Sequence, residues 1–180
     1  MYTMQLVQKH KKTLKACTAK ERRIIMAERK QFVYHIDALP FTPLVEKENI
    51  NTQFILGDNI QISFIQNPPG ATFPLHSHDC EQILIMLEGT EEHIVDGKEF
   101  HMEAGDVCVH PGGVEHGGKT LTGFKGIDIF SPPRDGVGGH VERMQKYKTM
   151  PNPDGSYPEN KIDAGIETWF KAVMAAMSKK

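Results

Sequence analysis

Hydrophobic and polar residues alternate along much of the chain after about residue 50, which is the pattern of strands with one buried face. The clearest alternation is Ile60–Gln66, and strand-like segments follow at 82–87, 92–95, 98–102, 106–110, 115–121 and 124–130. Turn residues separate them, and Asp96-Gly97 between two such segments is the strongest hairpin signal in the chain. Short strands at this spacing predict a β-sandwich or β-barrel.

The two ends of the chain have a different pattern. Residues 3–30 have a helix-forming composition without proline or glycine, and a capping box at Thr18–Glu21 allows two helices rather than one. The prolines in Leu39–Pro43 end any helix and predict a crossing segment. Residues 131–158 predict a long loop with one helical turn near 141–147, and a final helix follows Asp163. We therefore expect a helical extension over 1–50, a β-barrel over 51–134 and a loop-rich extension over 135–180 that ends in a helix.

Composition places the chain among ordinary globular domains. It has 180 residues, of which 39% are hydrophobic and 24% are charged. No apolar run is long enough to span a bilayer, and the start lacks the apolar core of a signal peptide. The three cysteines, Cys17, Cys80 and Cys108, show no paired spacing, so we expect a reducing, cytoplasmic compartment and no membrane partner.

Charge is unevenly distributed along the chain. Residues 1–30 hold nine Lys and Arg against two Glu, although the whole chain has a net charge of −2. A basic arm can attract nucleic acid. No aromatic or glycine-rich nucleic-acid motif accompanies it, so we interpret it as a solvated helix beside an acidic body and expect no nucleic-acid partner.

Two glycine-bracketed segments carry the candidate chemistry. The first contains His76, His78 and Gln82 after Gly70, and the second runs from Gly105 through Pro111-Gly112-Gly113 to His116. Alternate residues of a strand face the same way, so His76 and His78 share a face. A turn near residues 79–80 would let Gln82 face inward, and His116 could close the set from a neighbouring hairpin.

These four residues predict a metal site. Three imidazoles and an amide oxygen suit one divalent transition metal ion such as zinc, nickel, iron or manganese, with one or two positions left for water or substrate. Cys80 and Glu81 are the competing ligands, and we expect the remaining histidines to be structural. A neutral amide in place of a carboxylate leaves the ion a stronger Lewis acid, which favours isomerase or lyase chemistry over oxygenase chemistry.

The two segments resemble the motifs of the cupin superfamily of small β-jelly-roll proteins. Gln82 occupies the usual glutamate position, and Thr120 stands where an asparagine is common. The resemblance covers roughly residues 55–134 and implies an all-β core, a cupin-like β-jelly-roll barrel with N-terminal and C-terminal helical extensions.

A narrower resemblance links Leu87-Glu88-Gly89 and residues 127–134 to the KdgF-type cupins of uronate catabolism. It implies that Asp128, Phe130 and Arg134 join the site, as a proton shuttle, a wall against water and a clamp on a substrate carboxylate, respectively. The alternative for Arg134 is a strand-ending turn in which the arginine holds the loop.

The sequence thus favours a metal-dependent enzyme that isomerises, or transfers a proton on, a small oxygen-rich anionic molecule such as a sugar acid. The alternatives are a metal-dependent dioxygenase and a non-catalytic sensor or binding protein. The run Ile83–Leu87 has more apolar residues than one barrel face needs, which predicts a homodimer.

Overall fold

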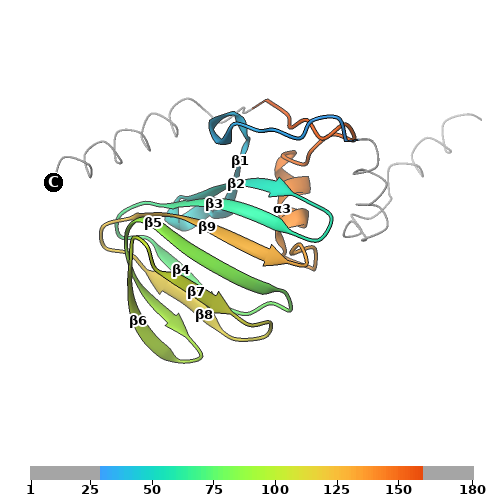
Figure 1. The fold of residues 1–180 in the computed structure, drawn as a ribbon. Helices are drawn as coiled ribbons and strands as arrows, with labels where there is room; N and C mark the ends of the chain where they lie inside the picture. Colours follow the sequence, from blue (N-terminus) through green and yellow to red (C-terminus); the bar gives the residue numbers. More distant parts are fainter. Residues whose placement is uncertain (1–28, 160–180) are drawn as a thin grey trace, which may run out of the picture.

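In a computed structural model, residues 29–159 are described, and their strands curl into a half-barrel (Figure 1). The elements in chain order are η1 Ile36–Ala38, β1 Phe41–Val45, η2 Glu46–Glu48, β2 Ile50–Leu56, β3 Gln61–Asn67, β4 Thr72–His76, β5 Glu81–Val95, β6 Lys98–Glu103, β7 Val107–His110, β8 His116–Lys119, β9 Phe124–Ser131 and α3 His140–Tyr147. The predicted all-β cupin-like barrel is confirmed, with α3 as the α-helix of the described part.

Strand β5 organises the sheet. The strands follow the order β1-β2-β3-β9-β5-β8-β4, and β6 and β7 also pair with β5. All of these pairings are antiparallel, and β5 contacts four other strands along its fifteen residues. Residues on the inner face of β5 therefore lie beside residues of the strands that follow it in the chain.

The hairpin predicted at Asp96-Gly97 is confirmed. Val95 of β5 pairs with Lys98 of β6 across the two-residue turn. Asp96 and Gly97 have φ angles of 52° and 69°. Positive φ at both central residues matches the right-handed twist of the flanking strands, and Asp-Gly adopts it at low cost.

The apolar segment at 82–87 and the strand-like segment at 92–95 turn out to be one strand. A register shift against β9 between Met86 and Glu88 leaves Leu87 on the outside, half exposed. Gly89 follows with φ +82°, and a Cβ there would lie 2.0 Å from the Gly123 carbonyl oxygen. A bulge and a glycine thus bend one long strand between two parts of the barrel.

The segment expected to cross between the N-terminal region and the barrel takes part in the sheet. Phe41–Val45 forms the edge strand β1, paired with β2. An edge strand tolerates Pro43 because its missing N–H breaks no ladder between two neighbours. The predicted helical turn near 141–147 is α3, whose Met144 joins a core cluster that includes Leu44, Ile50 and Phe54. The helices predicted over 3–30 and after Asp163 lie outside the described residues, and the three-part domain division stays a prediction.

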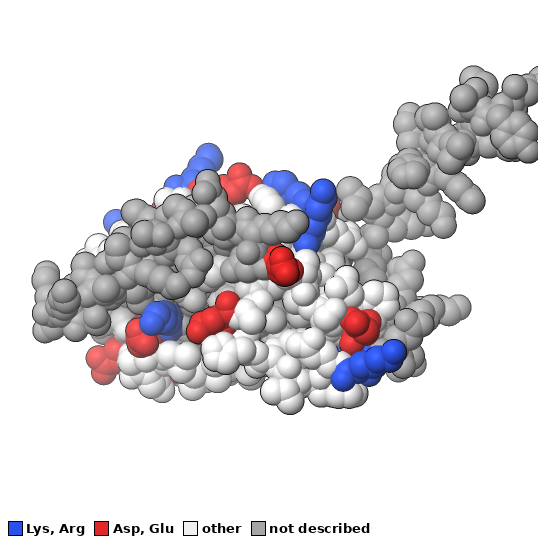
Figure 2. All heavy atoms as spheres, turned by 90° about the horizontal axis from the view of Figure 1, so that it is seen from above, with Lys and Arg blue, Asp and Glu red and all other residues white. Residues whose placement is uncertain are grey.

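On the face of the molecule seen in Figure 2, acidic and basic side chains are interspersed among uncharged residues. This face carries no patch of one sign over the described residues. Within residues 29–159, no helix is long and apolar enough to cross a membrane.

Candidate metal centre

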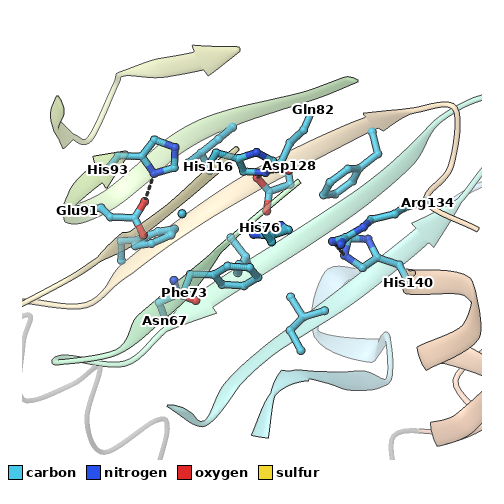
Figure 3. A pocket seen from close by; sticks show the side chains of 16 residues that line it. Asn67, Phe73, His76, Gln82, Glu91, His93, His116, Asp128, Arg134 and His140 are labelled. Carbon is cyan, nitrogen blue, oxygen red and sulfur yellow. Dashed lines mark hydrogen bonds and ion pairs between the residues drawn. The ribbon is translucent and has the colours of Figure 1, made fainter. Parts of the chain in front are cut away.

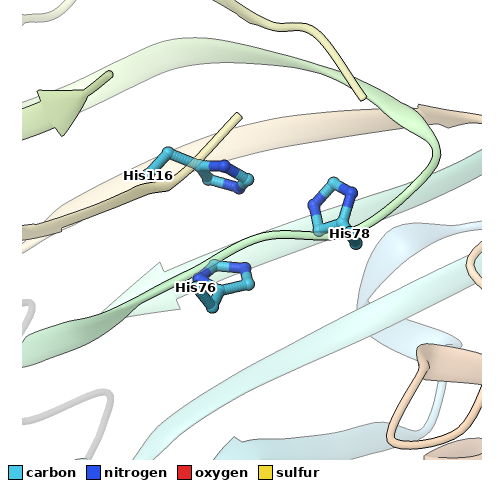
Figure 4. Close-up of side chains that lie close together, drawn as sticks. All are labelled: His76, His78 and His116. Carbon is cyan, nitrogen blue, oxygen red and sulfur yellow. The ribbon is translucent and has the colours of Figure 1, made fainter. Parts of the chain in front are cut away.

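Three histidines lie close together, two of them on the neighbouring strands β4 and β8 and the third in the loop after β4 (Figure 4). His76 ends β4 and lies directly opposite His116, the first residue of β8, in the antiparallel register. His78 follows in the loop between β4 and β5. One ligand nitrogen from each of the three lies within 4.8 Å of the others.

The backbone fixes the orientation of each ring. The Nδ1 atoms of His76, His78 and His116 lie 3.0, 2.8 and 2.9 Å from the carbonyl oxygens of Pro74, Cys80 and Val114. A carbonyl can only accept, so each Nδ1 carries the hydrogen and donates it. In the neutral ring the Nε2 atom then presents a lone pair. Such contacts set the tautomer and orientation of metal-binding histidines.

Burial keeps these rings neutral. It lowers the pKa of His76 to about 4 and that of His116 to about 4, and it also lowers the pKa of His78. Neutral imidazole is the form that binds a metal ion. Near neutral pH each of the three rings is therefore neutral, with an unprotonated Nε2 that can bind a metal ion.

Gln82 adds an oxygen to the same point. Its Oε1 lies 3.1 Å from His78 Nε2 and 3.2 Å from His116 Nε2, while its Nε2 donates to Asp128 Oδ1 at 2.8 Å. An amide oxygen has no hydrogen to give to either ring. Acceptors arranged in this way suit a cation, so His76, His78, Gln82 and His116 form a candidate site for a divalent transition metal ion.

Two loops that pack tightly hold this arrangement. The Gly113 N–H donates to the His78 carbonyl oxygen at 2.8 Å, which joins the β7–β8 turn to the β4–β5 loop. A Cβ on Gly112 would lie 2.2 Å from the Asp79 carbonyl oxygen. The glycines of the second motif are therefore needed because another backbone passes against them.

Asp128 is hydrogen-bonded to Gln82, one of the four candidate ligands. It lies on β9 opposite Leu84 of β5 and is 5% exposed. Burial raises its pKa to about 7, against the opposing effect of the hydrogen bond from Gln82. A carboxyl group with this pKa can exist in either protonation state near neutral pH, which suits a general acid or base.

The same pocket contains Arg134 (Figure 3) and is also lined by Phe130. The Phe130 ring lies edge-on to His78 with the ring centroids 5.7 Å apart. The Arg134 guanidinium is 3.3 Å from His140 Nε2 and forms no ion pair with a carboxylate of residues 29–159. The structure thus brings all seven residues singled out in the sequence to one pocket and its rim.

The competing ligands lie elsewhere. Cys80 Sγ is 3.3 Å from His78 Nδ1, the ring nitrogen that faces away from Gln82, and the Cys80 carbonyl accepts from the same nitrogen. Glu81 is exposed. Thr120, at the position where an asparagine is common, is fully buried and donates to the Thr90 carbonyl oxygen at 2.6 Å.

Sequence reasoning missed a second set of polar residues inside the barrel. Glu91 and His93 on β5 line the pocket, and His140 closes it from the start of α3. His110 on β7 stacks on His116 with the ring centroids 4.3 Å apart. The sequence signal for Glu91 and His93 was their two-residue spacing after Gly89, which puts both on the inner face. That spacing does not reveal which residues of other strands they contact.

Comparisons with known proteins agree with this geometry. Residues 63–125 match the family described as "Cupin domain". An RmlC-like cupin from Shewanella frigidimarina is 25% identical over 60% of this chain and 96% of its own, with a TM-score of 0.55. KdgF from Halomonas sp. is 23% identical over 58% of this chain and 96% of its own, with a TM-score of 0.53, which shows a shared fold. Among curated proteins there is no match. The half-barrel, the matched domain and the two histidine segments lead to one conclusion: the described part of the chain has a cupin fold, with a match to the cupin domain over residues 63–125.

Proposed function

We propose that this protein is a metal-dependent enzyme that transfers a proton on a small, oxygen-rich carboxylate such as a sugar acid, in an isomerase or lyase reaction. The observation that carries the proposal is the Asp128 carboxyl group. It is buried, has a pKa of about 7 and accepts a hydrogen bond from the metal-ligand candidate Gln82. The Gln82 side chain thus links Asp128, the group proposed to transfer the proton, to the candidate metal ligands.

Each side chain of the pocket has a role in this reaction. A divalent ion bound by the histidines and Gln82 would polarise a carbonyl or enediol oxygen as a Lewis acid. Asp128 takes a proton from the substrate at one atom and returns it at another, and Gln82 holds its Oδ1 in place. Phe130 covers the His78 side of the pocket and excludes water.

The position of Arg134 favours an anionic substrate. Its guanidinium is largely buried in the pocket, and burial lowers its pKa. Burying a cation without a carboxylate partner is costly, and a substrate carboxylate would remove that cost by a bidentate contact. The guanidinium also lies 3.3 Å from His140 Nε2, which helps to hold it in place.

The test uses the metal-loaded full chain and a ring-opening unsaturated uronate in deuterium oxide, followed by nuclear magnetic resonance. We expect conversion to a linear ketone that contains one solvent deuteron. Asp128→Asn should lower kcat by about 10²–10⁴-fold, because it removes general acid–base catalysis. Arg134→Gln should raise KM more than it lowers kcat.

Lys125→Gln serves as the control, because its ammonium group lies on the outside of the same strand, 3.0 Å from Glu88. This variant should keep full activity. Full activity of Asp128→Asn would contradict the proposal. Oxygen uptake equal to substrate loss would instead favour a dioxygenase, and binding of the uronate without turnover would favour a sensor.

A further inference from the structure

A second group of potential ligands lies inside the barrel beside the first. It consists of His93 on β5 and of Cys108 and His110 on β7, and one ligand atom from each lies within 4.8 Å of the others. His93 is 4% exposed and His110 is fully buried. We refer to these three residues as the inner cluster.

The sheet register explains why the inner cluster forms. Cys108 pairs with Leu84 and His110 with Gln82, and both of these β5 residues face the core. Cys108 and His110 therefore face inward together. The upper part of β5 bends back over them after Gly89 and brings His93 to the same point, with its ring 5.0 Å from that of His110.

Hydrogen bonds join the side chains of the inner cluster at positions where metal ligands could lie. His93 Nε2 lies 2.7 Å from His110 Nε2, so one of the two nitrogens must donate a proton to the other. His93 Nδ1 lies 2.8 Å from Glu91 Oε2 and donates to that carboxylate. His110 Nδ1 is buried and has no hydrogen-bond partner in the described part of the chain.

We propose that His93, Cys108 and His110 bind a second divalent metal ion of the zinc type, and that Glu91 orients His93 through its Nδ1–H. A thiolate with two imidazoles suits zinc or cobalt, and a carboxylate behind a metal-binding histidine is a common supporting contact. On binding, the Cys108 thiol proton and the proton between the two imidazoles leave to solvent, and the two Nε2 atoms move apart. Three protein ligands leave a fourth position for water.

This centre differs chemically from the one formed by His76, His78, Gln82 and His116. The first set offers only nitrogen and oxygen, whereas the inner cluster contains a sulfur. Gly118 supports the inner cluster, because a Cβ there would lie 2.7 Å from the Glu91 side chain and displace the carboxylate that holds His93.

The sulfur permits a direct test that needs no substrate and is independent of the proposed function. Metal-free full-length protein is titrated with Co²⁺ while the near-ultraviolet absorption is recorded. We expect two equivalents to bind and a thiolate-to-cobalt charge-transfer band to accompany one of them. Cys108→Ser should abolish that band and lower the stoichiometry from two to one.

Matched controls separate the two centres. Cys80→Ser and Cys17→Ser should keep the band, because Cys80 Sγ contacts the outer nitrogen of His78 and lies outside the inner cluster. His76→Ala should weaken the other equivalent and leave the band. Retention of the band in Cys108→Ser, or its loss in Cys80→Ser, would overturn the assignment.

A measurement on the unaltered chain keeps the proposal testable if Cys108→Ser fails to fold. X-ray absorption of wild-type protein loaded with two zinc ions should show a sulfur neighbour at about 2.3 Å. Binding of a single zinc ion, or a first coordination sphere with only nitrogen and oxygen, would contradict the second metal site.

Discussion

At the scale of single residues, Gln82 connects the three histidines to Asp128. Its amide oxygen faces the histidines and its amide nitrogen donates to Asp128 at 2.8 Å. A carboxylate could replace the oxygen as a ligand but could not donate to Asp128. The amide therefore serves both partners, with its oxygen toward the histidines and its N–H toward Asp128.

Gln82→Glu is expected to couple two carboxyl groups. In metal-free protein the new carboxyl group would lie next to Asp128, and two like charges at that distance raise the pKa of the pair. Infrared titration of the buried carboxyl groups should therefore show a midpoint above the value of about 7 that burial gives Asp128 alone. Gln66→Glu is the charge-matched control, because Gln66 lies on the outward face of β3, and it should leave that midpoint unchanged. A midpoint that does not move in Gln82→Glu would show that the two groups do not interact.

At the scale of elements, the candidate metal centre depends on the contact between two loops. The β4–β5 loop carries His78 and the β7–β8 turn precedes His116, and the Gly113 N–H joins them through the His78 carbonyl oxygen. No strand pairing holds His78 itself, because it lies between β4 and β5. The position of one ligand therefore depends on close backbone packing.

Gly112→Ala is expected to separate the loops. The new Cβ would lie 2.2 Å from the Asp79 carbonyl oxygen, a backbone atom that cannot rotate away. We expect a loss of about 1–3 kcal/mol in the free energy of unfolding and a fall in metal affinity of about 10–100-fold, measured by urea unfolding and competitive metal titration. Gly136→Ala is the matched control, because nothing lies within 4 Å of a Cβ there and its φ is not positive. Equal metal affinity in the two variants would show that loop packing does not position His78.

At the scale of the whole molecule, the outer face of the sheet carries rows of apolar side chains. Ile83 on β5 lies between Ile129 of β9 and Val109 of β7, and Ile85 lies in the same way between Ile127 and Val107. Val107 and Val109 are 59% and 51% exposed. Contiguous exposed apolar surface of this kind marks interaction sites.

We expect two copies of the chain to associate through this face. The double variant Val107→Glu with Val109→Glu should be monomeric in size-exclusion chromatography with light scattering, whereas the wild type should elute as a dimer. Leu121→Glu is the control, because this residue is 71% exposed in the segment between β8 and β9 and lies off that face. A monomeric wild type would refute the homodimer.

The buried titrating groups also give the whole molecule a pH-dependent stability in its metal-free form. Burial lowers the pKa of His76 and His116 to about 4 and that of His110 to about 3, from 6.5. Between pH 6.5 and 4 the unfolded chain therefore binds protons that the folded chain does not, and stability falls as pH falls. Burial also lowers the pKa of His78 and His140. Asp128 acts in the opposite sense, because the folded state keeps its proton up to about pH 7, but it is one group against five.

Above pH 6.5 the sign reverses. The pKa of His93 is raised to about 9, so the folded state holds a proton that the unfolded chain has lost, and this stabilisation disappears as pH rises through 9. Thermal unfolding of metal-free protein between pH 4 and 9 should therefore show its highest midpoint close to neutral pH. A midpoint that is higher at pH 5 than at pH 7 would contradict the assignment of these buried groups.

Local patterns in the sequence were sufficient for much of the fold and for the choice of candidate metal ligands. Alternation identified the strands, Asp96-Gly97 identified a hairpin, and the spacing of His76, His78, Gln82 and His116 identified residues that meet in the structure. Each of these signals comes from neighbouring residues, because side-chain alternation and turn conformation are properties of a short stretch of backbone.

Only the tertiary structure decided which inward faces meet. The continuity of β5 through its bulge, the contact between Gln82 and Asp128, and the inner cluster of His93, Cys108 and His110 depend on sheet register between distant segments. The raised pKa of Asp128 depends on burial, which no local pattern specifies. The sequence by itself determined the candidate metal ligands and the type of fold, and the closure of the sheet determined the chemistry around them, because register and burial arise only when strands far apart in the chain pair.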